Sequence, residues 1–310
     1  MKNIGFMFSG QGAQYIEMGK DLYENYSEVK EAFDNAQEIV GFDLKGICFN
    51  GPKEKLDSTD VTQVAIFTLS AGIFNVLKNR GIKSSVCCGL SLGEYSALYA
   101  SGIITFEEGV KLLKLRGEIM ANAYPKGKGT MTAVIGLSKE DVEECIEKVK
   151  VNGVVEIANL NCPSQIVVTG EVEAIEKAEE EFKANKAMKV VRLDVSGPFH
   201  SSLLKDASLD LKKELEKIDF KKPSITVLTN YTGDVINEET LVDTLTGQMC
   251  STVYFEDNIR KMIDLNVDTF VEIGPGKALS GFVKRVDRKK KILNIENVEG
   301  LEAFVDYINE

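Results

Sequence analysis

Short apolar segments alternate along the chain with longer segments whose apolar positions repeat at helical spacing. Residues 4–8 and 86–88 form two of the apolar segments, and each is followed by a serine or a glycine, as buried strands often are. Further elements are predicted later in the chain: strands over 225–230 and 269–273, and helices from residue 202 and over 301–308. This alternation predicts an α/β fold with a largely parallel sheet.

Residues 127–196 show a different order of elements. Their pattern predicts β-α-β-β-α-β: strand 131–135, helix 139–149, strand 154–159, strand 165–169, helix 172–184 and strand 188–194. This is the order of a ferredoxin-like fold. Segments that contain glycine and proline, 125–129 and 196–198, flank it and suit crossings between domains. We therefore predict a large domain from residues 1–126 and 197–310, with a small ferredoxin-like domain inserted at 127–196.

Composition and charge restrict the class of protein. Of 310 residues, 44% are hydrophobic and 27% are charged, as in soluble globular proteins. The formal net charge of −11 argues against a nucleic-acid-binding protein, because phosphate neutralisation requires a basic face. One dense basic run stands out: Lys284, Arg285, Arg288, Lys289, Lys290 and Lys291. The longest uncharged stretch, 61–77, contains several polar side chains, so it predicts a buried helix and no membrane span.

The cysteines and the N-terminus indicate the compartment. The 6 cysteines form no C-x-x-C pair, and a single histidine is available to join them as metal ligands. We interpret them as reduced thiols and expect no metal. The apolar run at residues 4–8 is too short for the apolar region of a signal peptide. We therefore expect no export signal and a cytoplasmic protein.

A candidate nucleophile lies at the end of the second predicted strand. Residues 89–93 fit G-x-S-x-G around Ser91, and a helix-compatible run, 94–100, follows. In a nucleophile elbow the glycines permit a sharp turn that holds the serine hydroxyl at the strand end, near a helix N-terminus. The five-residue pattern alone also occurs in ordinary turns. The strand before it and the helix after it favour the nucleophile.

The chain has one histidine, His200, so any Ser-His mechanism must use it. A lone histidine is more often a packing or surface residue than a catalytic base. However, His200 follows the glycine-proline segment 196–198 and precedes a predicted helix, whose N-terminus would keep the imidazole neutral. A base also needs an acceptor at its other ring nitrogen, and no acceptor is evident from the sequence pattern.

Arg116 lies on the apolar side of a predicted helix that starts with the capping box Thr105–Glu108. The polar face of this helix carries Glu107, Lys111, Lys114 and Glu118, whereas the neighbours of Arg116 three and four residues away are Leu112, Leu113, Ile119 and Met120. The guanidinium therefore requires an anion from elsewhere. A distant acidic residue, exposure of the charged end to solvent, or a substrate carboxylate held by two hydrogen bonds would each satisfy it.

Five segments carry a resemblance to a known family: 8–14, 89–97, 115–117 with Met120, His200, and 272–277. In this order they resemble the malonyl-CoA:acyl carrier protein transacylases, from residue 3 to about 296. The resemblance implies an α/β-hydrolase-like large domain with a ferredoxin-like small domain. It also implies transfer of a malonyl group from malonyl-CoA to the phosphopantetheine thiol of acyl carrier protein, through a malonyl-serine, for fatty-acid synthesis.

The resemblance assigns roles to individual residues. Ser91 resembles the acylated nucleophile, His200 its base, and Gln248 the residue whose main-chain carbonyl orients the histidine. The backbone N–H groups of Gln11 and Leu92 resemble the oxyanion hole. This implied set contains neither a metal nor a redox cofactor; CoA enters as part of the substrate.

Three further residues are implied on the substrate side. Arg116 resembles the arginine that pairs with the malonyl carboxylate, and Met120 belongs to the same motif. Phe199 resembles the bulky residue that would crowd a methyl group on the substrate's α-carbon. Leu90 stands where the family commonly has histidine before the nucleophile.

The implied partner is an acidic carrier protein, and the basic run from Lys284 to Lys291 is a candidate docking surface. A solvated helix end explains the same run. Three other functions remain open: a serine thioesterase or hydrolase, a non-catalytic module that binds a carrier protein, and an acyltransferase of polyketide synthesis.

Overall fold

The computed structural model describes residues 2–310. Its strands are β1 (Ile4–Phe8), β2 (Val86–Gly89), β3 (Gly129–Ile135), β4 (Val155–Cys162), β5 (Gln165–Glu171), β6 (Lys189–Arg192), β7 (Thr226–Val227), β8 (Val253–Tyr254), β9 (Thr269–Ile273) and β10 (Lys291–Ile295). Its longer helices are α2 (Ser27–Val40), α5 (Thr59–Asn79), α6 (Gly93–Ser101), α7 (Phe106–Asn122), α8 (Lys139–Val149), α9 (Val172–Ala184), α10 (Lys205–Leu215), α11 (Leu241–Cys250), α12 (Phe255–Asp264), α13 (Ala278–Val286) and α14 (Val298–Asn309). Shorter helical segments are α1 (Lys20–Asn25), α3 (Leu44–Asn50), α4 (Lys53–Leu56), and the 3₁₀ turns Lys150–Asn152, Ser202–Leu204 and Glu238–Thr240.

The larger lobe is built on a parallel sheet, as the alternating pattern predicts. Its strand order is β10-β9-β1-β2-β7, and every neighbouring pair is parallel. Phe8 at the end of β1 is level with Gly89 on β2 and with Ile273 on β9. Consequently, the turns that leave these three strands lie at the same edge of the sheet, where α/β proteins place their ligands.

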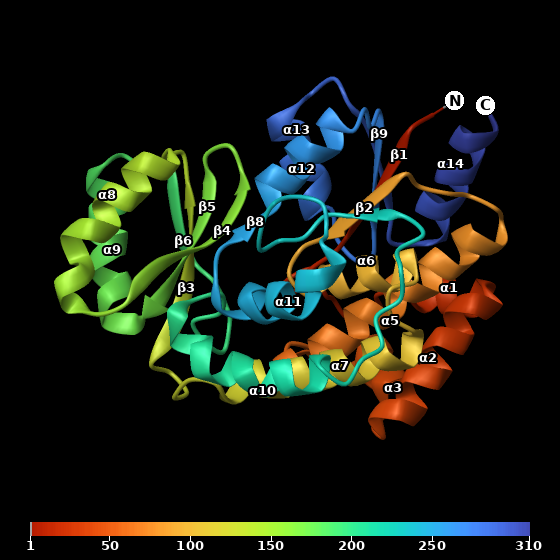
Figure 1. The fold of residues 1–310 in the computed structure, drawn as a ribbon, viewed down its shortest axis with the longest axis horizontal. Coiled ribbons are helices and arrows are strands. Elements are labelled where there is room, and N and C mark those ends of the chain that lie inside the picture. Colours follow the sequence, from red (N-terminus) through yellow and green to blue (C-terminus); the bar gives the residue numbers. More distant parts are fainter. Residues whose placement is uncertain (1) are drawn as a thin grey trace.

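The smaller lobe has the predicted ferredoxin-like order. Its sheet runs β6-β3-β5-β4, and these strands are antiparallel to their neighbours. In Figure 1 this lobe stands at the left, with α8 and α9 against one face of the sheet. The α/β fold with an inserted ferredoxin-like part is therefore confirmed. The exact boundaries at residues 127 and 196 stay a prediction.

Three strands differ from the predictions. The strand expected over 225–230 is short, because only Thr226 and Val227 pair with β2. β10 lies at the edge of the large sheet, where its half-exposed residues give a weak apolar pattern. β8 follows α11 in the large lobe but pairs in parallel with β4, so it extends the small-lobe sheet. A two-residue strand carries no periodic signal, so the pattern could not predict it.

α5 is the central helix of the large lobe. Among residues 2–310 it is the one helix long and apolar enough to cross a membrane, yet 89% of its apolar window is buried inside the protein. It packs against α2, α6 and α7. The stretch 61–77 is therefore a core helix, as predicted.

α7 begins at the predicted capping box: Thr105 Oγ1 accepts from the Glu108 N–H, and the Glu108 carboxylate accepts from the Thr105 N–H. Gly117 brings α7 very close to the start of α5, because a Cβ atom at this position would lie 2.6 Å from Asp60 Cα and 2.8 Å from the Thr59 carbonyl oxygen. This close approach places Arg116, the preceding residue, inside the large lobe.

The contact at Gly117 predicts a stability difference between two helical glycines. Gly117→Ala forces α7 away from α5 and should lower the free energy of unfolding by about 1–3 kcal/mol. Gly281→Ala on α13 is the matched control, because no atom lies within 4 Å of the added Cβ. It should stabilise the protein by up to about 1 kcal/mol through helix propensity. Urea unfolding measures the free energy of unfolding of both variants. Equal changes in the two variants would show that close packing at Gly117 does not matter.

Candidate active site

Ser91 lies in a sharp turn between β2 and α6. Its φ of 54° is left-handed, which is uncommon for a residue with a side chain. A side chain at either flanking glycine would collide with the backbone. A Cβ on Gly89 would lie 2.0 Å from the Gly93 carbonyl carbon, and a Cβ on Gly93 would lie 2.3 Å from the Phe8 carbonyl oxygen. The motif is therefore the strained strand-to-helix turn that nucleophile elbows require.

Asn230 holds this turn from the side. Its Oδ1 accepts from the Ser91 N–H at 2.6 Å, and its Nδ2 donates to the Gly89 carbonyl at 2.8 Å. Asn258 on α12 in turn accepts from Asn230 Nδ2 and donates to the Thr229 carbonyl. These buried amide contacts fix the elbow in its left-handed conformation.

His200 contacts Ser91 from the segment that leaves the small lobe. Its Nε2 lies 2.8 Å from Ser91 Oγ, and its Nδ1 lies 2.7 Å from the Gln248 carbonyl oxygen. A carbonyl oxygen only accepts, so Nδ1 carries the hydrogen and the lone pair of a neutral ring lies on Nε2. This tautomer can receive a proton from the serine hydroxyl.

The imidazole is held in its neutral state. Burial is the main cause that lowers the pKa of His200 to about 3; the positive charge of Arg116 lowers it further, and the bond to the Gln248 carbonyl opposes the shift. The sequence prediction gave the neutral state but the wrong main cause, a helix N-terminus. The residue is only 5% exposed, and the loss of water around the imidazole has the larger effect on its pKa.

Gln248 connects the base to the rest of the site. Its main-chain oxygen holds His200, while its fully buried side chain accepts from Arg116 Nη2 at 2.9 Å. Its Nε2 donates to the Ser91 carbonyl at 2.9 Å and to the Glu94 carboxylate at 2.8 Å. The side-chain amide is thus fixed at both ends, which also fixes the position of the backbone carbonyl.

Arg116 is fully buried beside the serine, so exposure of its charge to solvent is excluded. Nη1 donates to Gln63 Oε1 at 2.8 Å, and Nη2 donates to Ser91 Oγ at 3.0 Å as well as to Gln248. These partners are neutral, and within residues 2–310 Nε has no hydrogen-bond partner. The Tyr95 ring lies 5.5 Å from the guanidinium carbon. A buried cation with neutral partners and an unused donor is suited to bind an anion.

The loop after β1 lies against the elbow. The Leu90 N–H donates to the Phe8 carbonyl at 3.0 Å, and a Cβ on Gly10 would lie 2.6 Å from the Leu90 carbonyl oxygen. Gln11 directly follows this contact, and Leu92 directly follows Ser91. Both expected oxyanion donors therefore belong to the two turns that meet at this sheet edge. The Leu90 side chain packs against a hydrophobic cluster that contains Met7 and Cys88.

Met120 and Phe199 are both buried, at 3% and 4% exposure. Met120 Sδ accepts from Gln63 Nε2, so Gln63 links Met120 to Arg116. Phe199 immediately precedes His200 in the same buried segment. The structure thus brings Met120 next to the Arg116 partner and Phe199 next to the base.

Three residues of this site were missed by the sequence analysis: Gln63, Glu94 and Asn230. Gln63 occupies a buried position of the long helix α5, where a polar side chain is a signal in itself. Glu94 follows the G-x-S-x-G motif and is fully buried, although an acid at this point reads as an ordinary first-turn residue of a helix. Asn230 ends the segment predicted as a strand, and only the fold brings it to Ser91.

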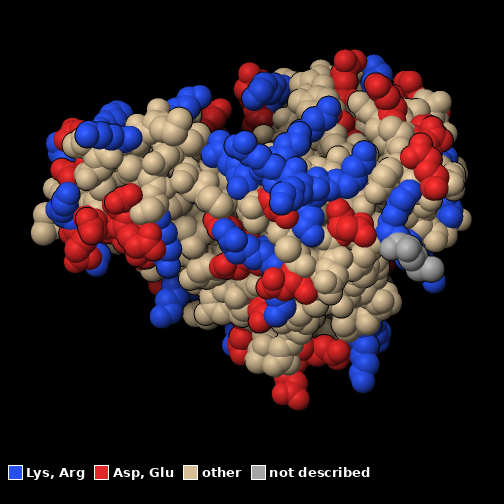
Figure 2. Space-filling model, turned by 90° about the horizontal axis from the view of Figure 1, so that it is seen from above, with Lys and Arg blue, Asp and Glu red and all other residues tan. Residues whose placement is uncertain are grey.

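The basic run lies at the end of α13 and the start of β10, and most of its side chains are exposed. Figure 2 shows Lys and Arg side chains gathered in a broad patch on this upper face of an otherwise acidic protein. Lys284 and Arg285 lie in the last turn of α13, as the solvated-helix interpretation requires, while Lys291 begins β10.

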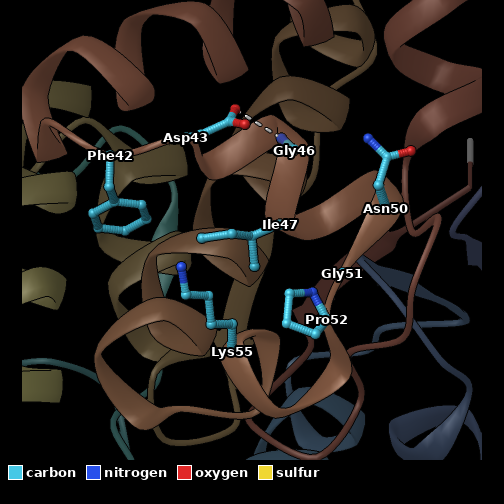
Figure 3. A pocket seen from close by; sticks show the side chains of 8 residues that line it. All are labelled: Phe42, Asp43, Gly46, Ile47, Asn50, Gly51, Pro52 and Lys55. Atoms are coloured by element: carbon cyan, nitrogen blue, oxygen red, sulfur yellow. Dashed lines mark hydrogen bonds between the residues drawn. The ribbon is translucent and has the colours of Figure 1, made fainter.

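A separate hollow of about 320 Å³ lies between α3 and α4 (Figure 3). Its lining includes Phe42, Ile47 and Lys55, and it shares no residue with the Ser91 site. The Asp43 carboxylate at its rim accepts from the Gly46 N–H and caps α3. Helix capping therefore explains why an acidic residue lies at the rim of this hollow.

The elbow, the neutral histidine and the buried arginine define an enzyme of the acyltransferase class. In agreement, the sequence model of a family described as an acyl transferase domain matches residues 5–299. The chain is 41% identical over 312 aligned residues to a malonyl CoA-acyl carrier protein transacylase of Bacillus subtilis, covering 100% of this chain and 98% of the relative.

Solved structures agree with the sequence match. The fold is similar to the crystal structure of a malonyl CoA-acyl carrier protein transacylase from Clostridium perfringens, with a TM-score of 0.95, 45% identity, and coverage of 99% of this chain and 97% of that one. It is also similar to a malonyl-transacylase in complex with a type II PKS acyl-carrier protein, with a TM-score of 0.96, 32% identity, and coverage of 99% and 100%. The chain belongs to the malonyl CoA-acyl carrier protein transacylase family.

The low pKa of His200 predicts an unusual pH profile for Ser91. His200 stays neutral until the pH falls toward about 3, so this residue should add no inflection near the ordinary histidine pKa of 6.5 to the rate of labelling by a fluorophosphonate. Labelling rates measured by mass spectrometry between about pH 5 and 8 test this. Ser91→Ala should give no label, and His200→Ala should lower the rate by about 10²–10⁴-fold. A half-maximal rate near pH 6.5 that persists in Glu94→Gln would show that the imidazole is not desolvated.

Proposed function

We propose that the protein transfers a malonyl group from malonyl-CoA to the phosphopantetheine thiol of acyl carrier protein by a ping-pong mechanism. The observation that carries this proposal is the buried Arg116 guanidinium, which lies 3.0 Å from Ser91 Oγ and has only neutral partners. In a malonyl thioester the carboxylate carbon is two bonds from the reacting carbonyl carbon. A cation next to the nucleophile is therefore placed to bind that carboxylate.

The first half-reaction acylates Ser91. The hydroxyl proton moves to His200 Nε2 as the oxygen attacks the thioester carbonyl, and the N–H groups of Gln11 and Leu92 stabilise the oxyanion. The Gln248 carbonyl stabilises the imidazolium through Nδ1–H, as a carboxylate does in a Ser-His-Asp triad. The intermediate collapses, the C–S bond breaks, and CoA leaves with the proton from His200.

The second half-reaction reverses these steps with a different thiol. The carrier thiol gives its proton to His200 and attacks the malonyl-serine ester, which regenerates Ser91. One thioester replaces another, so the reaction runs in both directions. The proposed steps use protein groups alone as nucleophile, base and oxyanion donors, with no cofactor. The place of action that we propose is the cytoplasm.

Arg116 favours this reaction over simple hydrolysis. A serine thioesterase needs the same elbow and histidine but no buried cation for the acyl group. Met120 is linked to the cation through Gln63, and Phe199 borders the base, so we place both at the acyl pocket. The similar structure bound to a type II PKS acyl-carrier protein supports a carrier protein as acceptor and keeps polyketide synthesis as the alternative pathway.

Mass spectrometry of the intact protein after brief mixing with acyl-CoA tests the proposal. Malonyl-CoA should add one malonyl group to the wild type and none to Ser91→Ala, and a pantetheine thiol should remove the group. Arg116→Ala should lower the malonyl-to-acetyl ratio of acylation by about 10- to 150-fold, because a hydrogen bond to a charged group contributes about 1.5–3 kcal/mol.

The matched control is Arg260→Ala, which removes an exposed arginine paired with Glu256 on α12 and should leave the ratio unchanged. An unchanged ratio in Arg116→Ala would refute the carboxylate clamp. Steady release of CoA without an acyl-enzyme would instead indicate a hydrolase.

We also propose that the basic patch at Lys284 and Arg285 docks the acidic carrier protein. Replacement of both Lys284 and Arg285 by Glu should raise the KM for the carrier protein by about tenfold. Added salt should reduce the difference in KM between this variant and the wild type. Acylation by malonyl-pantetheine, which lacks the phosphates of CoA, should keep its rate. Reversal of exposed Lys213 and Lys217 near the end of α10 is the control. Equal KM values for both double variants would exclude this docking surface.

A further inference from the structure

Glu94 is a buried carboxyl group that the proposed mechanism does not use. It follows the elbow on the first turn of α6 and has no exposed surface. Its Oε2 accepts from the Asn230 N–H at 3.0 Å and from Gln248 Nε2 at 2.8 Å. Its Oε1 has no hydrogen-bond partner within residues 2–310. A buried carboxyl group with only one oxygen satisfied is costly unless it has a function or a partner charge.

The partner charge is Arg116, which Glu94 reaches through a single side chain. Gln248 donates from Nε2 to Glu94 and accepts at Oε1 from Arg116 Nη2, so one amide bridges the carboxyl group and the guanidinium. The two charged groups attract each other without forming a direct ion pair. When Glu94 is ionised, its negative charge balances the positive charge of Arg116 through this bridge.

In the part of the chain that the structure describes, no other group around Glu94 can supply the negative charge that balances Arg116. Asn230 and Gln248 are neutral amides, Cys88 faces it from β2, and Tyr95 adjoins it on α6. Burial raises the pKa values of both the Cys88 thiol and the Tyr95 hydroxyl, so both stay neutral near pH 7. Glu94 is thus the group near Arg116 whose charge can change when an anion enters the site.

Burial, the largest cause, also raises the pKa of Glu94 to about 7, although the two N–H donors and Arg116 act in the opposite direction. A carboxyl group in this range changes its protonation in response to a small change in nearby charge. A second carboxylate bound to Arg116 would remove the attraction that keeps Glu94 ionised and would add a repulsion.

We propose that Glu94 is the proton-linked counter-charge of Arg116: it is ionised in the unliganded enzyme and takes up one proton when the malonyl carboxylate binds Arg116. This inference rests on the proposed malonyl transfer. The site stays neutral in both states, with Arg116 balanced first by Glu94 and then by the substrate. The proton comes from solvent and goes to the Glu94 carboxyl group, and no other bond changes. Glu94 acts through Gln248 and Arg116 as a positioning residue for malonyl substrates.

Proton uptake during acylation tests this link in the wild-type enzyme. The protein is mixed with malonyl-CoA or acetyl-CoA in weakly buffered solution with a pH indicator, and acyl-enzyme is counted by mass spectrometry. Up to one proton per acyl group should be taken up with malonyl-CoA near pH 7–8, and none with acetyl-CoA. CoA release is common to both donors, so any proton from its thiol cancels in the difference.

The same link predicts a pH dependence of affinity. Above pH 7 the apparent affinity for malonyl-CoA should fall by up to about tenfold per pH unit, because Glu94 must be protonated on binding, while the affinity for acetyl-CoA should stay constant. In Glu94→Gln the malonyl affinity should lose this dependence. Glu272→Gln is the matched control, because Glu272 is a buried acid that caps α13 away from Arg116; it should keep the dependence.

The outcomes separate the two proposals. Equal proton release or uptake with both donors, while malonyl-serine forms, would overturn the role of Glu94 and leave malonyl transfer intact. Absence of malonyl-serine would overturn the proposed function itself. The comparison of the two donors needs no variant, so a failure of Glu94→Gln to fold would not prevent the test.

Discussion

The buried positive charge of Arg116 is the constraint around which the active site is organised. A fully buried guanidinium must be surrounded by acceptors, and here these come from different elements: Gln63 on α5, Ser91 on the elbow and Gln248 on α11. None of the three acceptors carries a charge. The fold thus keeps a desolvated cation next to Ser91, and we propose that Glu94 balances it from a distance until a carboxylate on the substrate completes the site.

The inserted lobe is connected in three places to the segments that hold His200 and Gln248. The chain returns from β6 directly into the segment that carries His200, and Gln248 is followed within a few residues by β8, which pairs with β4 of the small lobe. Glu156 on β4 also accepts from the Ser202 N–H and hydroxyl, just beyond the base. The position of the small-lobe sheet therefore helps to set the contact between His200 and the Gln248 carbonyl.

The elements with strong patterns were predicted from the sequence, and those without were not. β1, the capping box of α7 and the β-α-β-β-α-β order agree with the pattern. β8 was missed and β7 was predicted too long, because short strands at sheet edges depend on neighbours and not on periodicity. Among site residues, the sequence indicated Ser91 by its G-x-S-x-G motif, His200 as the single histidine, and Arg116 as a charge on an apolar helix face.

By itself the sequence determined the alternation of strands and helices, the glycines that permit the elbow at Ser91, and the uncompensated charge on the apolar side of α7. These are local properties, encoded by spacing and residue type over short segments. The contact of the Gln248 carbonyl with His200 was implied by the family resemblance and by no local pattern, and only the tertiary structure decided that Gln248 would also bridge Glu94 to Arg116. Such contacts join residues more than a hundred positions apart or use backbone atoms common to every residue, so no local pattern encodes them.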